Sequence, residues 1–131
     1  MEPAVRPFEC LNLASCISFI KITQKKLKTN VKPRSIVLAS NSPRRKALLE
    51  QLRLPFKVVP TFVDESRNVS ENAKNLVERI SEKKARSVEV EDDWLIIAAD
   101  TVINLNEKIF GKPFSKEDGF LMLRELSGKV H

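Results

Sequence analysis

The segment at residues 40–45 joins an apolar run to a predicted helix and carries side chains suited to binding phosphate. Ser42 is a candidate N-cap, Pro43 fits the first helical position, and Arg44 and Arg45 follow in the first turn. A helix N-terminus offers free backbone N–H groups and a partial positive charge, and arginine adds forked donors that match phosphate oxygens. Taken by itself, the segment favours the alternative of an N-cap followed by two solvated arginines.

Asp100 directly follows a second apolar run and precedes Thr101. A carboxylate at the end of a buried strand is a frequent metal ligand or general base, although a residue that simply caps the strand end explains it equally well. Glu65 follows another predicted strand and is a second carboxylate that could converge with it. Two carboxylates plus phosphates are what Mg²⁺ usually requires. Lys84 and Lys112 could add positive charge, although each lysine taken singly is more simply a solvated surface group.

These side chains lie beside elements that the sequence pattern predicts as alternating strands and helices. Strands are predicted at residues 35–39, 56–59, 94–99 and 108–110, with 101–105 either extending the strand at 94–99 or pairing with it, and helices at 44–52, 70–88 and 115–126. The helix at 70–88 is predicted from apolar residues at helical spacing with charges between them. This order of elements predicts an α/β or α+β domain with a mixed sheet.

The composition is that of a globular protein, since 42% of the 131 residues are hydrophobic and 31% are charged, and the length suits a single domain. His131 is the only histidine, so this sequence holds no His-based triad or multi-histidine metal site. No apolar stretch reaches the roughly 20 residues that a membrane helix needs. Both cysteines, Cys10 and Cys16, fall near the N-terminus, and this usage indicates a reducing cytoplasm.

Residues 1–34 form a basic leader in front of a nearly neutral body. They hold seven Lys or Arg residues against Glu2 and Glu9, whereas the other 97 residues hold 16 basic and 15 acidic side chains. A nucleic-acid-binding domain would carry its basic face on the body, so we expect no nucleic-acid partner. Lysines follow the apolar run at 11–20 instead of preceding it, which argues against a signal peptide. We expect a poorly ordered or peripheral extension, a translated upstream region, or a short helix packed on the body.

Read together, the motifs of the body, residues 35–131, resemble the Maf family of nucleoside triphosphate pyrophosphatases. The resemblance runs from Ile36 to His131. The matching motifs, in order, are Leu38-Ala39-Ser40-x-Ser42-Pro43-Arg44-Arg45, Phe56 with Glu65, Lys84-Ala85, Ala99-Asp100-Thr101-Val102, Gly111-Lys112-Pro113 and Met122-Leu123-Arg124-x-Leu126-Ser127-Gly128-x-x-His131. Separate motifs in one order and at compatible spacing make the resemblance specific.

The resemblance implies a Maf/ITPase-like fold of mixed α/β (α+β) type, with a mixed twisted sheet and a central cleft between two lobes. It implies hydrolysis of dTTP or UTP, with modified pyrimidine nucleotides as further candidates, to the monophosphate and pyrophosphate. A divalent cation, Mg²⁺ or Mn²⁺, would be the cofactor. By position, Asp100 and Glu65 would be catalytic and would share the metal. The residues that would contact the substrate are Ser42, Arg44, Arg45, Lys84, Thr101 and Lys112.

The resemblance also indicates a subgroup, through Arg44 and Thr101. Family members that act on 7-methylguanosine triphosphate typically have Trp and Gln at these two positions, so this sequence is similar to the dTTP/UTP subgroup. A methylated purine is cationic and favours an aromatic face, whereas Arg44 would repel it.

Family members continue well past the motif that ends at His131, so the resemblance implies a C-terminally truncated, incomplete form of the domain. The alternative to an enzyme is a non-catalytic remnant or a septation-linked interaction protein. For the enzyme, the expected partner is a nucleoside triphosphate in the cytoplasm, with no membrane partner. A homodimer is an open option for the full-length form.

Overall fold

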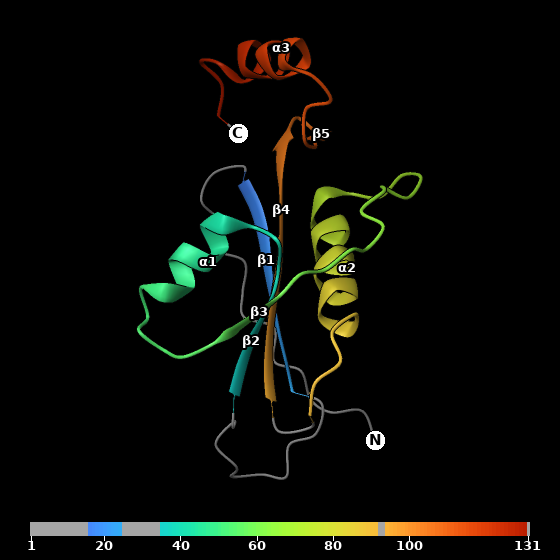
Figure 1. Ribbon diagram of the computed structural model, residues 1–131. Helices are drawn as coiled ribbons and strands as arrows, with labels where there is room; N and C mark the ends of the chain where they lie inside the picture. Colours follow the sequence, from blue (N-terminus) through green and yellow to red (C-terminus); the bar gives the residue numbers. More distant parts are fainter. Residues whose placement is uncertain (1–15, 25–34, 92–93, 131) are drawn as a thin grey trace.

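The computed structural model describes residues 16–24, 35–91 and 94–130, and for residues 16–24 it describes the backbone only (Figure 1). Its elements, in chain order, are β1 (Cys16–Gln24), β2 (Ser35–Ala39), α1 (Pro43–Glu50), β3 (Lys57–Val59), α2 (Ala73–Arg86), β4 (Trp94–Leu105), β5 (Lys108–Phe110) and α3 (Lys116–Leu126). Strands and helices alternate from β2 to β4, β5 follows β4 directly, and the strands form a mixed sheet. This arrangement confirms the predicted α/β fold class.

The long strand β4 organises the sheet, whose order is β1-β4-β2-β3, with β5 also pairing with β4. β2 is parallel to both β3 and β4, whereas β1 and β5 run antiparallel to β4. Ala39, the last residue of β2, lies opposite Val59 of β3 and Ala98 of β4. The chain therefore leaves β2 and β3 at one edge, beside the middle of β4, where Asp100 lies.

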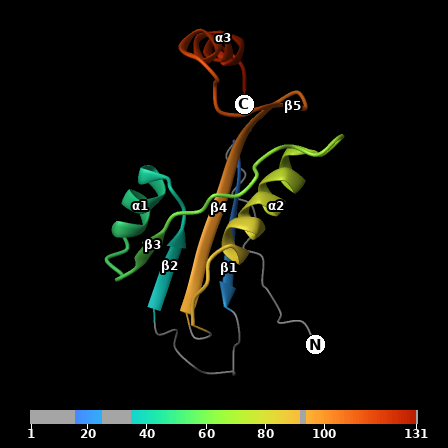
Figure 2. The same cartoon turned by 45° about the vertical axis from the view of Figure 1, so that its right-hand side comes forward.

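The main core lies between the sheet and α2, which contacts β4 and β1 (Figure 2). Residues two apart on a strand point to the same side of a sheet, so β2 and β4 each present alternate apolar residues to α2. The cluster on this side comprises Val37, Ala39, Ala85, Val88, Ile96 and Ala98, all buried. Small alanine side chains at three of these positions allow the helix to approach the strands closely.

The strand β1 differs from the expected leader. Residues 16–24 pair antiparallel with β4 along the whole strand, with Phe19 opposite Asp100 and Ile22 opposite Ile97. Residues 16–24 therefore form an edge strand of the sheet, which differs from the expected poorly ordered extension or short helix. β-branched residues favour a strand here, but the pairing partner lies about 80 residues away in the sequence. The expectations for residues 1–15 and 25–34, including Cys10, lie outside the described residues, as does His131.

The helix starts follow the predicted caps, and two boundaries differ for local reasons. Ser42 accepts the backbone N–H of Arg45 at the start of α1, and Ser115 does the same for Asp118 in α3. α1 ends at Glu50 instead of residue 52, because the chain turns at Arg53, which has φ 52°. α2 begins at Ala73 instead of residue 70, because Ser70 has φ 60°, outside the right-handed helical region.

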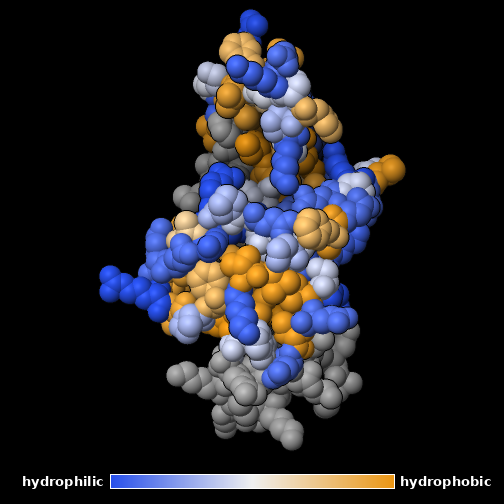
Figure 3. Space-filling view, viewed as in Figure 1, coloured by the Kyte–Doolittle hydropathy of each residue, from blue (hydrophilic) through white to orange (hydrophobic). Residues whose placement is uncertain are grey.

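A smaller cluster holds α3 at the far end of β4, beyond β5 (Figure 1). Leu105, Phe110 and Leu126 form it, and Lys108 Nζ lies 2.6 Å from Glu125 Oε2 beside it. On the face drawn in Figure 3, apolar side chains gather over the sheet region and again near α3, with a hydrophilic belt between them. None of the helices in the described part of the chain is long and apolar enough to cross a membrane.

Stability should depend on the buried side of α2. Ile80 is fully buried, whereas Leu121 on α3 is 60% exposed. We expect Ile80→Ala to lower the free energy of unfolding by about 2–5 kcal/mol through lost burial and a cavity. Leu121→Ala should change it by less than about 0.5 kcal/mol. Urea unfolding followed by the fluorescence of Trp94, the only tryptophan, measures both, and equal effects would contradict the packing described.

Candidate functional site

Lys84 lies at the centre of a group of charged side chains at the carboxyl edge of β2 and β3. It projects from α2, and its Nζ lies 2.8 Å from Asp100 Oδ1 of β4 and 2.8 Å from Glu65 Oε1 of the loop before α2. The Lys84 side chain is 7% exposed and that of Asp100 is 12% exposed, whereas Glu65 is 43% exposed. One buried ammonium therefore draws together the two carboxylates that the sequence predicts as catalytic.

The acidity of Glu65 follows from this arrangement. Burial by itself would raise the pKa of Glu65, but the hydrogen bond and charge of Lys84, with Lys112 and Arg45 nearby, lower it below its ordinary value. Lys112 is exposed, and its Nζ lies 3.8 Å from Glu65 Oε2. Glu65 is therefore held as a carboxylate at neutral pH, with one cation on its buried side and another toward the solvent.

Arg45 brings the turn after β2 to the same edge. Its Nη2 donates to Thr101 Oγ1 at 3.3 Å, and its Nη1 donates to Ser40 Oγ at 3.5 Å. Thr101 is the residue after Asp100, so the guanidinium lies close to the two carboxylates. A cation fixed at this edge can receive an anionic group.

Ser40 is a site residue that the motif reading did not single out. It is buried, and its Oγ accepts the backbone N–H of Ser42 at 3.1 Å in addition to Arg45 Nη1. The hydroxyl therefore fixes both the turn and the arginine. The sequence places a serine directly after the strand, but its role depends on a contact that the turn creates.

Ser42 and Arg44 lie at the same turn but in different settings. The Oγ of Ser42 caps α1 by accepting the N–H of Arg45 at 3.4 Å. Arg44 is exposed in the first turn of α1 and takes no part in the hydrogen bonds of the described site. The structure thus brings together Arg45, Thr101 and the ion group around Lys84, and leaves Arg44 facing the solvent.

Asn41 joins this turn to the loop that carries Glu65. Its Nδ2 donates to the carbonyl of Thr61 and its Oδ1 accepts the N–H of Thr61, both at 2.9 Å. A primary amide can satisfy both backbone groups of one residue in this way. The contact spans 20 residues of sequence, so the sequence pattern gives no indication of it.

The donor set fits a divalent cation only in part. Within the described ranges, no three or more His, Cys, Asp or Glu side chains gather for a metal. Two carboxylates nevertheless converge on one cation, the ammonium of Lys84. Mg²⁺ is commonly bound by one or two carboxylates, substrate phosphates and water. Asp100 and Glu65 therefore fit a metal that a phosphorylated ligand would bring or complete.

Comparison with known sequences identifies relatives for this part of the chain. The family described as Maf-like protein matches residues 35–131. Proteins named dTTP/UTP pyrophosphatase are similar to it: one from Ruminiclostridium cellulolyticum is 46% identical over 75% of this chain and 52% of its own length. One from Thermosipho africanus is 48% identical over 73% of this chain and 49% of its own length. The chain thus spans about half the length of these curated relatives.

Lys84 should stabilise the fold as the counter-ion of two carboxylates. We expect Lys84→Met to lower the free energy of unfolding by about 3 kcal/mol at pH 7, because it removes the cation beside the nearly buried Asp100 and leaves Glu65 with only the exposed Lys112. The stabilisation that comes from the lowered pKa of Glu65 is present above the ordinary value of 4.5 and is lost as the pH falls through the lowered pKa. The difference between the variant and wild type should therefore shrink on acidification.

Urea unfolding at neutral and acidic pH measures this difference. Lys83→Met is the matched control, because Lys83 is the preceding residue of α2 and its side chain is exposed. The role of Lys84 would be contradicted if both variants lost the same free energy of unfolding, or if the loss in Lys84→Met grew toward acidic pH.

Proposed function

This chain belongs to the Maf family, and we propose that it acts as a nucleoside triphosphate pyrophosphatase that converts dTTP or UTP to the monophosphate and pyrophosphate. The observation that carries the proposal is the convergence of three cationic side chains and two carboxylates at one sheet edge. Arg45, Lys84 and Lys112 supply the positive charge around Asp100 and Glu65. The names of the similar proteins support the choice of dTTP and UTP.

The cations would bind the triphosphate. Arg45 is held beside Thr101 and can offer a planar pair of donors to phosphate oxygens. Lys112 reaches the same edge from the solvent side, and Arg44 and Ser42 lie at the helix start that faces it. Such charges stabilise the transition state because negative charge grows on the leaving pyrophosphate.

Asp100 would activate the attacking water. Its carboxylate lies beside Thr101 and is nearly buried, so it can accept a proton from a water positioned against the α-phosphorus. The new bond joins the water oxygen to that phosphorus, the bond to the β-phosphate bridging oxygen breaks, and pyrophosphate leaves. Glu65 would orient the water from the opposite side of Lys84.

Asp100 and Glu65 would also hold Mg²⁺ or Mn²⁺ together with phosphate oxygens. Such an ion supplies charge neutralisation and orientation of the phosphates when bound. Lys84 would then exchange one of its carboxylate partners for a phosphate oxygen, since both ligands carry the same sign of charge.

The other expected properties extend this proposal. The substrate would be the principal partner, with no nucleic acid or membrane involved, in the cytoplasm, and a homodimer remains open for a longer form. The alternative is a non-catalytic remnant or a septation-linked interaction protein. Release of pyrophosphate from a nucleotide panel by the purified protein separates the two, because the alternative gives no release above the buffer rate.

Asp100 should control turnover in protein that remains folded. We expect Asp100→Asn to lower kcat by about a hundred- to ten-thousand-fold, because the amide keeps the shape but cannot accept the proton. Asp118→Asn, the same substitution in α3 outside the site, should keep wild-type activity. More than a tenth of wild-type activity in Asp100→Asn would remove Asp100 from this role.

The base preference should follow Arg44 and Thr101. We expect kcat/KM for dTTP and UTP to exceed that for 7-methyl-GTP by at least about tenfold, the discrimination that a few contacts commonly supply. A cationic base would be repelled by the exposed guanidinium of Arg44, whereas Thr101 can offer its hydroxyl to a pyrimidine edge. Steady-state rates on the three nucleotides test this, and equal use of 7-methyl-GTP would contradict the subgroup.

A further inference from the structure

The loop that delivers Glu65 has no regular secondary structure of its own. It occupies residues 60–72, between β3 and α2. Its beginning is fixed by the contact between Asn41 and Thr61. Glu65 lies farther along the loop, so the position of its carboxylate depends on its contacts with Lys84 and Lys112 and on what holds the backbone that follows it.

The guanidinium of Arg79 ties the second half of the loop to α2. Arg79 of α2 donates through Nε to Glu71 Oε1 and through Nη2 to Glu71 Oε2, each at 2.7 Å. The same Nη2 donates to the backbone carbonyl of Ser66 at 2.8 Å. Ser66 is the residue after Glu65. Arg79 therefore ties both sides of the loop to one side chain of α2, the helix that also carries Lys84.

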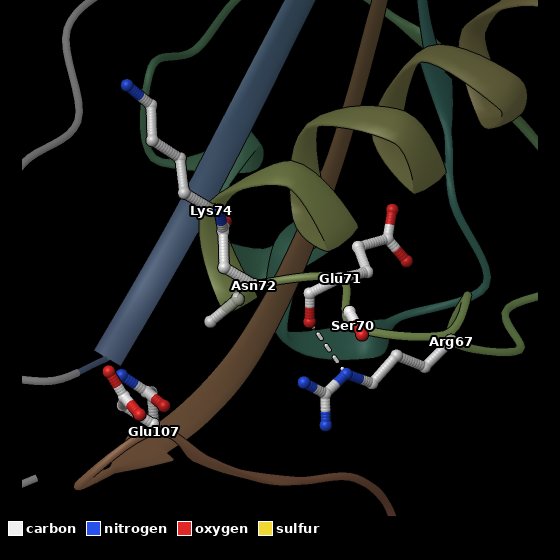
Figure 4. A pocket seen from close by; sticks show the side chains of 8 residues that line it. Arg67, Ser70, Glu71, Asn72, Lys74 and Glu107 are labelled. Carbon is white, nitrogen blue, oxygen red and sulfur yellow. Dashed lines mark hydrogen bonds between the residues drawn. The ribbon is translucent and has the colours of Figure 1, made fainter.

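Glu71 is the matching anchor in the loop. Its side chain is 8% exposed, and Oε2 also accepts the backbone N–H of Asn68 at 3.0 Å. Arg67 Nε donates to the backbone carbonyl of Glu71 at 2.7 Å, the dashed contact at the rim of the pocket in Figure 4. The bond with Arg79 is the main cause that lowers the pKa of Glu71 to about 2, so the pair stays charged at neutral pH.

We propose that Arg79 and Glu71 are positioning residues that set Glu65 in place to share a divalent cation with Asp100. This inference rests on the metal role of the two carboxylates in the proposed function. The pair touches neither carboxylate and acts through the Ser66 carbonyl and the loop backbone. Groups that orient metal ligands typically change metal affinity 10- to 100-fold when they are removed.

The test is Mn²⁺ binding to the full chain, measured by electron paramagnetic resonance of the free ion, both without and with added inorganic pyrophosphate at a fixed concentration. We expect Arg79→Gln and Glu71→Gln each to weaken binding by about 10- to 100-fold. Arg86→Gln is the matched control, because Arg86 forms a similar pair with Glu82 on the same helix but that pair is exposed and far from the loop. It should bind Mn²⁺ within about twofold of wild type.

A double-mutant cycle separates positioning from general loosening of the fold. In a Glu65→Gln background, Arg79→Gln should weaken Mn²⁺ binding no further, because the ligand that it positions is already gone. Trp94 fluorescence shows whether each variant is folded. If Arg79→Gln does not fold, Glu71→Gln and Arg79→Lys are each compared with and without Glu65→Gln in the same way. Two results would overturn this inference and leave the metal site intact: wild-type Mn²⁺ affinity in these variants, or an equal loss of Mn²⁺ affinity with and without Glu65. Absence of Mn²⁺ binding in wild type overturns it together with the metal site.

Discussion

The buried ammonium of Lys84 is the constraint on which this structure depends. Its two partners come from different parts of the chain, Asp100 from the central strand and Glu65 from a loop. Burying charged groups such as Lys84 and Asp100 is costly, and apolar replacements of buried ion pairs are often neutral or stabilising. We infer that the group is kept for its charge, since it places two carboxylates at an edge where other cations gather. The group forms only when α2, the loop that carries Glu65 and β4 hold these side chains in the right relative positions.

Two kinds of contact hold these elements in their relative positions. Parallel pairing of β2 with β3 and β4 brings the turn after β2 to the middle of β4. Side chains then fix the segments that lack regular structure: Ser40 holds the turn with Arg45, and Asn41 holds the loop at Thr61. The regular elements give the approximate positions of the charged groups, and these few polar contacts give the final ones.

The sequence predicts those features that depend on residues close together in the chain. The caps at Ser42 and Ser115 are set by neighbours in sequence. Asp100 differs from the expectation, because β4 continues past the apolar run at 94–99 and holds Asp100 in its middle instead of at its end. The meeting of Glu65 with Lys84 was predicted only as a convergence of charges, because the loop between them has no pattern of its own. The strand β1 was missed, since its partner is distant in the sequence. The roles of Ser40 and Asn41 depend on the folded turn, so residue type alone could not reveal them.

The pairing of β4 on both sides has a consequence for insertions and deletions. Along residues 95–98 it is bonded to β1 on one side and β2 on the other. Adding or removing one residue there would rotate every later side chain to the opposite face. Asp100 would then point away from Lys84, and only the core residues that precede the change would keep their places. The turn at Asn106 and Glu107 comes after Asp100, between the paired strands β4 and β5. A length change at that turn would shift β5 against β4 but leave Asp100 on its side of the sheet. The spacing from Ile96 to Asp100 should therefore stay invariant in any descendant that keeps the charged group.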